Sequence, residues 1–368
     1  MTSGGPQVQQ QSQSRRVVVW GTGNVGRPSV RAVVADPGLE LVGVVVSNPD
    51  KEGKDAAELC DLPTPTGVLA TRDVDAVLAL APDAVVYTAT GDTRPDDALA
   101  DVLRCLRAGA DVVSTSIYPL IHPGSTPPEM KAEVEAACAE GGASVWVSGI
   151  DPGFGADLLA PVVVGACVSV DKVVVREVFN YATYHAPHAV KDLVGFGMPM
   201  DQTPPMLWPT VPTMVWGGVL KVLAETLGVE LDEVDEVIER RPLERTLELP
   251  IGTFEAGTQG AFRLQVRGLV GGEEKIVMDH VTRIDDDCAP DWPVPPEQSM
   301  GCHQVLVTGD PDVALTLTAE DADGDRNVGG IAMSAGRIVH ALHAVADAPN
   351  RIITAMDIPL VPGTGLLK

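Results

Sequence analysis

The segment Arg16-Val-Val-Val-Trp-Gly-Thr-Gly-Asn-Val-Gly26 decides the fold of this chain. Strand-forming residues lead directly into a glycine-rich turn, and a helical pattern of valines follows, which is typical of a dinucleotide-binding unit. Gly21 permits the tight turn, Gly23 lets the backbone approach a pyrophosphate, and Gly26 lets the helix pack on the strand. The helix N-terminus would face the phosphates. The alternative is an ordinary turn between a strand and a helix. The residues predicted here to bind a cofactor are Gly21, Thr22, Gly23, Asn24, Val25 and Gly26.

Length and charge limit what the protein can be. The 368 residues are 45% hydrophobic, enough for two globular domains. The net charge is -25, from 26 basic and 51 acidic residues. Such a surface repels phosphate backbones and anionic membranes, so we expect neither a nucleic-acid nor a membrane partner.

The six cysteines are scattered and form no CxxC pair, which argues against a zinc knuckle or a redox pair. Free thiols are typical of a reducing cytosol. The first 13 residues have no apolar core like that of a signal peptide. We therefore predict a cytoplasmic protein in which residues 1–15 form a disordered tail.

From residue 17 onward, predicted strands and helices alternate. Strands are expected at 39–46, 84–88, 111–115 and 144–147, with helices at 96–108 and 128–140 among them. This alternation predicts an α/β Rossmann-type, doubly wound parallel sheet over residues 16–155.

The pattern changes after Pro152-Gly153. Strands are expected at 172–181, 243–250, 261–269, 275–284, 304–308 and 314–319, and helices at 213–227 and 232–240. Residues 156–328 are therefore predicted to form an α+β substrate and dimerisation domain with a mostly antiparallel sheet. Residues 329–368, a long apolar helix and an extended segment, are expected to pack back on the first domain.

The end of the second predicted strand bears on cofactor choice. NAD-specific sheets usually place an acidic residue there for the adenosine ribose, and this chain has Ser47. Ser47 and Asn48 could bind a 2′-phosphate that Lys51 and Lys54 neutralise, which favours NADP over NAD. The alternative is a solvated polar loop.

Two further loops are predicted to reach the cofactor. The carboxyl ends of parallel strands face the ligand crevice. Thr90 and Gly91, which follow the strand at 84–88, are therefore expected beside the nicotinamide ribose, unless this loop only caps the next helix. Ser116, which follows the strand at 111–115, is also predicted to bind the cofactor.

Three stretches carry a resemblance to a known family. They are the Gly21 turn with Val46-Ser-Asn-Pro49, then Val113-Ser-Thr-Ser-Ile-Tyr-Pro119, and Gly149-Ile-Asp-Pro-Gly-Phe-Gly-Ala-Asp157. The chain resembles the dihydrodipicolinate reductase-like group that includes 2,4-diaminopentanoate dehydrogenase and the NAD(P)-dependent amine dehydrogenases. The resemblance implies a homodimer and the reversible oxidative deamination of a small amine to a ketone or aldehyde.

One departure from the family matters. Its amine dehydrogenases carry a catalytic glutamate just after the strand that matches 111–116, where this chain has Ile117 and Tyr118. Tyr118 and His122 are the nearest groups that could replace it. Two alternatives therefore stay open: a carbonyl or imine reductase that uses Tyr118 as proton donor, and a non-catalytic NADPH sensor.

The substrate site is predicted from two stretches. Residues 180–188 concentrate tyrosine and histidine, and residues 204–216 are rich in Pro, Met and Trp. The alternative for residues 180–188 is a polar surface loop, and the alternative for residues 204–216 is a place in the core or in a subunit interface. No metal is predicted, because the two histidines of the first stretch have no evident third ligand. Asp151, in the 149–157 stretch, is predicted either to face the cofactor or to cap the following helix. The residues predicted to line the substrate pocket are Tyr181, Tyr184, His185, His188, Trp208 and Trp216.

Overall fold

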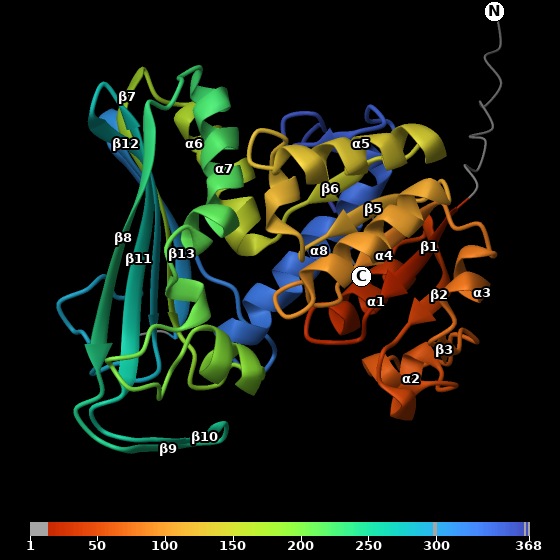
Figure 1. Ribbon diagram of the computed structural model, residues 1–368, viewed down its shortest axis with the longest axis horizontal. Helices are drawn as coiled ribbons and strands as arrows, with labels where there is room; N and C mark the ends of the chain where they lie inside the picture. The colour runs from red at the N-terminus through yellow and green to blue at the C-terminus, as the bar shows by residue number, and fades with distance from the viewer. Residues whose placement is uncertain (1–13, 297–299, 364–365, 367–368) are drawn as a thin grey trace, which may run out of the picture.

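The structure is a computed structural model that describes residues 14–296, 300–363 and 366, so the predicted tail lies almost wholly outside the described residues. Two sheets form separate layers, with helices between them (Figure 1). The first sheet is entirely parallel, in the order β15-β6-β5-β4-β1-β2-β3, which confirms the predicted doubly wound fold. Its strands are β1 (Arg15–Trp20), β2 (Leu39–Val45), β3 (Ala70–Thr71), β4 (Ala84–Tyr87), β5 (Asp111–Ser114), β6 (Val145–Val147) and β15 (Ile352–Ile353).

Helices cover both faces of this sheet because its central strands are apolar on both sides. Val17 and Val19 of β1 face one hydrophobic core, and Val18 faces the other. The first core holds α1 (Gly26–Ala35) and α8 (Arg326–Val345), and the second holds α3 (Val74–Leu78), α4 (Pro95–Arg107) and α5 (Pro128–Gly141). The short α2 (Ala56–Cys60) follows β2.

The second sheet has the order β14-β13-β7-β12-β11-β8, and all its neighbours are antiparallel except β12 and β7. This confirms the predicted mostly antiparallel sheet. Helices α6 (Ala160–Val164) and α7 (Val211–Leu227) lie against its inner face, and the hairpin of β9 (Leu247–Leu249) and β10 (Gly252–Phe254) extends from one end (Figure 1). The strands are β7 (Ser169–Asn180), β8 (Glu233–Pro242), β11 (Gln259–Val270), β12 (Glu273–Arg283), β13 (Gly301–Asp310) and β14 (Val313–Leu317).

The prediction of a helix at 232–240 is wrong, because this segment is strand β8. Val234, Val237 and Ile238 fit a helical spacing, but β8 pairs with β11 along its whole length. Glu236 of β8 also contacts α7: its carboxylate accepts a hydrogen bond from the Thr213 N–H at the start of that helix, 2.7 Å away. Tertiary pairing overrides the local periodicity here.

The last part of the chain returns to the first sheet. Helix α8 packs against α1, and β15 adds a strand beside β6. By length and composition α8 could cross a membrane, but half of that stretch is buried within the structure, as in a core helix.

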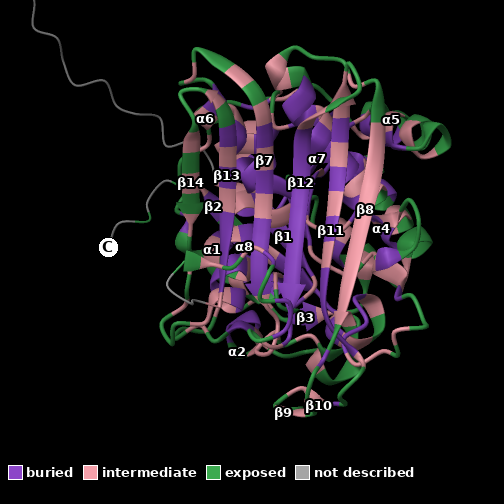
Figure 2. Cartoon of the chain, turned by 90° about the vertical axis from the view of Figure 1, so that its left-hand side faces the viewer, coloured by how far each residue is buried: buried purple, intermediate pink, exposed green. Residues whose placement is uncertain are grey.

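No helix formed by residues 14–296, 300–363 or 366 covers the outer face of the second sheet (Figure 2). Asp279 lies on this face in the central strand β12. Its carboxylate is fully buried and forms ion pairs with Arg176 at 2.7 Å and with Arg263 at 2.8 Å. A buried carboxylate with two guanidinium partners leaves this face ordered and rich in charge.

Candidate active site

A cavity of about 900 Å³ lies between the two sheets. Most residues predicted to bind the cofactor line its nucleotide end: Gly21, Thr22, Gly23, Asn24, Val25, Ser47, Asn48, Lys51, Thr90, Gly91 and Ser116. Gly26 does not line it, but a Cβ there would collide with the carbonyl oxygen of Gly21. Gly21 itself has φ of +106°, and the Cβ position of Gly23 faces open space. The turn therefore fits a dinucleotide pyrophosphate, as the sequence predicts.

Two cationic side chains line the cavity near the end of β2, where the sequence predicts the adenosine ribose. The Lys51 ammonium donates to the Thr22 carbonyl and hydroxyl oxygens, each 3.0 Å away, and so ties the end of β2 to the glycine turn. Arg72, directly after β3, is exposed and lines the same end of the cavity. Arg72 was not predicted, because β3 is only two residues long and gives little signal in sequence.

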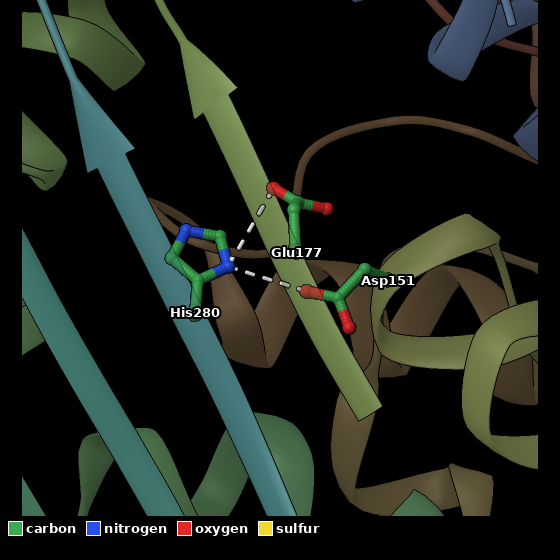
Figure 3. Close-up of side chains that lie close together, drawn as sticks. All are labelled: Asp151, Glu177 and His280. Carbon is green, nitrogen blue, oxygen red and sulfur yellow. Dashed lines mark hydrogen bonds and ion pairs between the residues drawn. The ribbon is translucent and has the colours of Figure 1, made fainter. Parts of the chain in front are cut away.

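Asp151, Glu177 and His280 meet at the other end of the cavity (Figure 3). The His280 Nδ1 lies 3.2 Å from Asp151 Oδ2 and 3.5 Å from Glu177 Oε1. Asp151 comes from the segment that joins the two sheets, and the other two come from the neighbouring strands β7 and β12. All three side chains are about 10% exposed or less. We call this group the acid–base cluster.

Surrounding side chains hold the acid–base cluster in place. The Trp216 indole N–H donates to Asp151 Oδ2 at 3.0 Å. His303 Nε2 lies 3.0 Å from Glu177 Oε2, and the Tyr181 hydroxyl donates to Glu177 Oε1 at 3.4 Å. Thr282 Oγ1 lies 2.7 Å from His280 Nε2. Glu177 thus has a partner on each oxygen, and both ring nitrogens of His280 are engaged.

The charges of the acid–base cluster support one another. Burial alone would lower the pKa of His280, but the Glu177 charge and the Asp151 hydrogen bond raise it above its usual value. Burial alone would raise the pKa of Asp151, but the hydrogen bond and charge of His280 hold it below its usual value. The contact between His280 and Asp151 therefore favours the charged form of each partner.

Aromatic rings form the remaining wall. Half of the chain's fourteen aromatic residues line this one cavity. Burial, helped by the Glu177 and Asp92 charges, raises the pKa of Tyr184 to about 12, and burial with the Asp92 charge raises the pKa of Tyr118. Both phenols therefore keep their protons at neutral pH. The seven rings belong to Trp20, Tyr118, Phe179, Tyr181, Tyr184, Trp216 and Phe262.

Besides Gly26, four residues predicted for the catalytic and substrate site do not line this cavity. His122 lines a separate hollow beside α7, where its Nε2 lies 3.0 Å from Glu225. Trp208 is 52% exposed and donates its indole N–H to the Thr203 carbonyl. These two predictions are corrected because the side chains point into other surroundings.

The two predicted histidines of the 180–188 stretch also lie outside the cavity wall. His188 is exposed and pairs with Asp192 at 2.6 Å. The His185 carbonyl accepts from the Asn24 side chain at 3.3 Å, so this stretch reaches the glycine turn through its backbone. Its two tyrosines do line the cavity, as predicted.

The acid–base cluster itself was largely missed. Glu177 and His280 stand inside long strands, where sequence alone reads them as ordinary members of an alternating pattern. The predicted cap role of Asp151 is wrong, because its backbone is non-helical and its carboxylate serves Trp216 and His280. A charged residue on the buried face of an otherwise apolar strand is the one signal that could have marked Glu177.

The dinucleotide turn and a buried acid–base group in one cavity define a nicotinamide-dependent oxidoreductase. Residues 15–116 match the dihydrodipicolinate reductase N-terminus family. An amine dehydrogenase of Streptomyces virginiae is 50% identical over 351 residues, which cover 95% of this chain and 98% of that protein. This chain belongs to the amine dehydrogenase family, as its three motifs predicted.

The chain is also similar to a more distant sequence relative and to a solved structure. A 2,4-diaminopentanoate dehydrogenase of Acetoanaerobium sticklandii is 25% identical, over 94% of this chain and 93% of its own. The solved structure of an amine dehydrogenase from Mycobacterium smegmatis has a TM-score of 0.77 over 95% of this chain and 97% of its own. At 19% identity that structure supports the fold alone.

Proposed function

We propose that this protein catalyses the reversible oxidative deamination of a small, mostly apolar amine that carries no carboxylate. The observation that carries the proposal is that the acid–base cluster of Asp151, Glu177 and His280 lines the same cavity as the glycine turn. The family's catalytic glutamate is absent after β5 in this chain. The acid–base cluster offers carboxylates in its place, from the segment that joins the two sheets and from β7.

The distribution of charge supports this substrate class. The lysine and arginine side chains on the cavity wall are Lys51, Arg72 and Arg94, all in the nucleotide half. Arg94 is bound to Asp101 at 2.9 Å. Among the described residues, the wall around the acid–base cluster offers carboxylates, histidines and aromatic rings to a substrate. An ammonium group is attracted there and a substrate carboxylate is repelled.

The reaction needs two proton transfers near the same nitrogen. A bound nicotinamide supplies the hydride acceptor. The carboxylates of the acid–base cluster take a proton from the substrate ammonium, and later from the water that adds to the iminium carbon. Loss of ammonia then gives the ketone or aldehyde. The balance is amine, NAD(P)+ and water to carbonyl compound, ammonia, NAD(P)H and a proton.

A second candidate is carbonyl or imine reduction with Tyr118 as proton donor. Tyr118 lines the cavity, and no hydrogen bond to its hydroxyl is formed by the described residues. A non-catalytic NADPH sensor is disfavoured because it has no use for a buried acid–base cluster.

An assay of reductive amination distinguishes these three candidate functions. Purified protein, NADPH or NADH, and a panel of ketones and aldehydes are mixed with and without concentrated ammonium near pH 9. Cofactor oxidation only with ammonium supports the amine dehydrogenase. Oxidation without ammonium supports the reductase, and no oxidation despite tight NADPH binding supports the sensor.

We further propose NADP as the preferred cofactor, supported by Lys51 and Arg72 in place of an acidic residue at the end of β2. We propose a cytoplasmic homodimer in which the open face of the second sheet meets a second copy (Figure 2). Light scattering on the wild type and on Arg263→Glu, which disrupts the pairing with Asp279, tests the dimer.

A further inference from the structure

Asp151 stands apart from Glu177 in how its two oxygens are used. Oδ2 of Asp151 accepts the Trp216 indole N–H at 3.0 Å and lies 3.2 Å from His280 Nδ1. Oδ1 has no hydrogen-bond partner among the described residues, and it points away from His280 and Glu177 (Figure 3). Asp151 lines the cavity, so Oδ1 is the carboxylate oxygen of the cluster that remains available to a substrate.

Both partners of Oδ2 come from the second domain, whereas Asp151 belongs to the segment between the domains. Trp216 lies in the second turn of α7, and His280 lies on β12. The Asp151 backbone is extended, with φ -149° and ψ 115°, and among the described residues the hydrogen-bond partners of its carboxylate are the side chains of Trp216 and His280. The rotamer of Asp151 therefore depends on its two side-chain partners.

The two partners differ in one decisive property. The bond from His280 depends on the protonation of the imidazole, whereas an indole N–H donates at every working pH. Trp216 is 4% exposed, and its ring lies 5.1 Å from the His280 ring between centroids, so it is well packed. It can therefore hold the carboxylate while protons move.

We infer that Asp151 Oδ1 is the atom that exchanges the proton with the substrate nitrogen, and that Trp216 is the positioning residue that directs it into the cavity. This inference rests on the proposed function. It assigns Asp151 a catalytic role, and it gives Glu177 the separate role of keeping His280 charged.

Trp216→Phe tests the inference, because phenylalanine keeps a ring and removes the donor. We expect kcat to fall about 10- to 100-fold with little change in KM, the range for a lost hydrogen bond to a charged group. The acidic limb of the pH profile moves to higher pH, because Asp151 loses a donor to its ionised form. Cofactor Kd, measured by calorimetry, stays unchanged.

Trp208→Phe is the matched control, since Trp208 makes the same kind of indole bond outside the cavity. It should leave kcat and the pH profile as in the wild type. If Trp216→Phe does not fold, β-(3-benzothienyl)alanine at position 216 replaces the N–H by sulfur at nearly constant shape. An unchanged pH profile in the folded variant overturns the inference and leaves the proposed function standing. A wild type without amine turnover defeats the proposed function itself.

Discussion

His280 Nδ1 lies 3.2 Å from Oδ2 of Asp151, so a residue of the interdomain segment and a residue of the central strand β12 form one buried pair. The pair therefore links the segment between the two sheets to the second sheet. Since Glu177 approaches the same nitrogen at 3.5 Å, the acid–base cluster joins three distant parts of the chain.

Glu177→Gln should keep the shape of the cluster and remove a charge. Because the Glu177 charge raises the pKa of His280, its loss lowers that pKa. The alkaline limb of kcat/KM should therefore move to lower pH, and kcat should fall about 100-fold. Initial rates of amine oxidation between pH 6 and 10 measure both effects, and an alkaline limb that stays in place would refute this role.

Substrate choice should follow the charge of the cavity. 1-Phenylethylamine carries a methyl group at the position where phenylglycine carries a carboxylate, and the two compounds are otherwise the same. The carboxylate would stand near Asp151 and Glu177, so kcat/KM should favour 1-phenylethylamine by at least about 100-fold. Equal values for the two compounds would show that the cluster does not select against carboxylates.

The NADP proposal predicts different effects on the two cofactors. Arg72→Ala should raise the Kd for NADP about tenfold and change that for NAD by less than about twofold, because only NADP offers a phosphate to the guanidinium. Lys51→Ala should weaken both, since Lys51 also binds the Thr22 backbone of the glycine turn. Calorimetry gives the four constants. Parallel losses in Arg72→Ala would place Arg72 outside a 2′-phosphate site.

Two histidines provide a direct test of where the chemistry lies. His122→Gln should change kcat by less than about twofold, because its ring lies in the separate hollow beside Glu225. His280→Gln should reduce kcat by about 100-fold or more, since it removes the partner of both carboxylates. Steady-state assays on both variants decide, and the reverse order of effects would restore His122 as the catalytic candidate.

The nucleotide end of the site was predictable from sequence because the chemistry is local. The glycine turn, Ser47 and Lys51 lie close in sequence to strands that end at one edge of a parallel sheet. The acid–base cluster was not predictable in the same way. Glu177 and His280 are 103 residues apart, and they become neighbours only through the parallel pairing of β7 with β12.

The strand β8 shows a second limit of sequence reasoning. Its valines and isoleucine satisfy two periodicities over a short segment, and pairing with β11 decides between them. The same pairing carries Glu236 to the start of α7, the helix that presents Trp216 to Asp151. Predicting a helix in place of β8 therefore also conceals how α7, which carries Trp216, is held at its N-terminus.

The most direct measurement compares the wild type with Asp151→Asn in amine oxidation, with NAD(P)H and ammonia quantified together. We predict equal amounts of NAD(P)H and ammonia from the wild type. In Asp151→Asn we predict a rate lower by about 100-fold or more with the cofactor Kd unchanged. Wild-type levels of both products from Asp151→Asn, or NAD(P)H without ammonia from the wild type, would contradict the proposed chemistry.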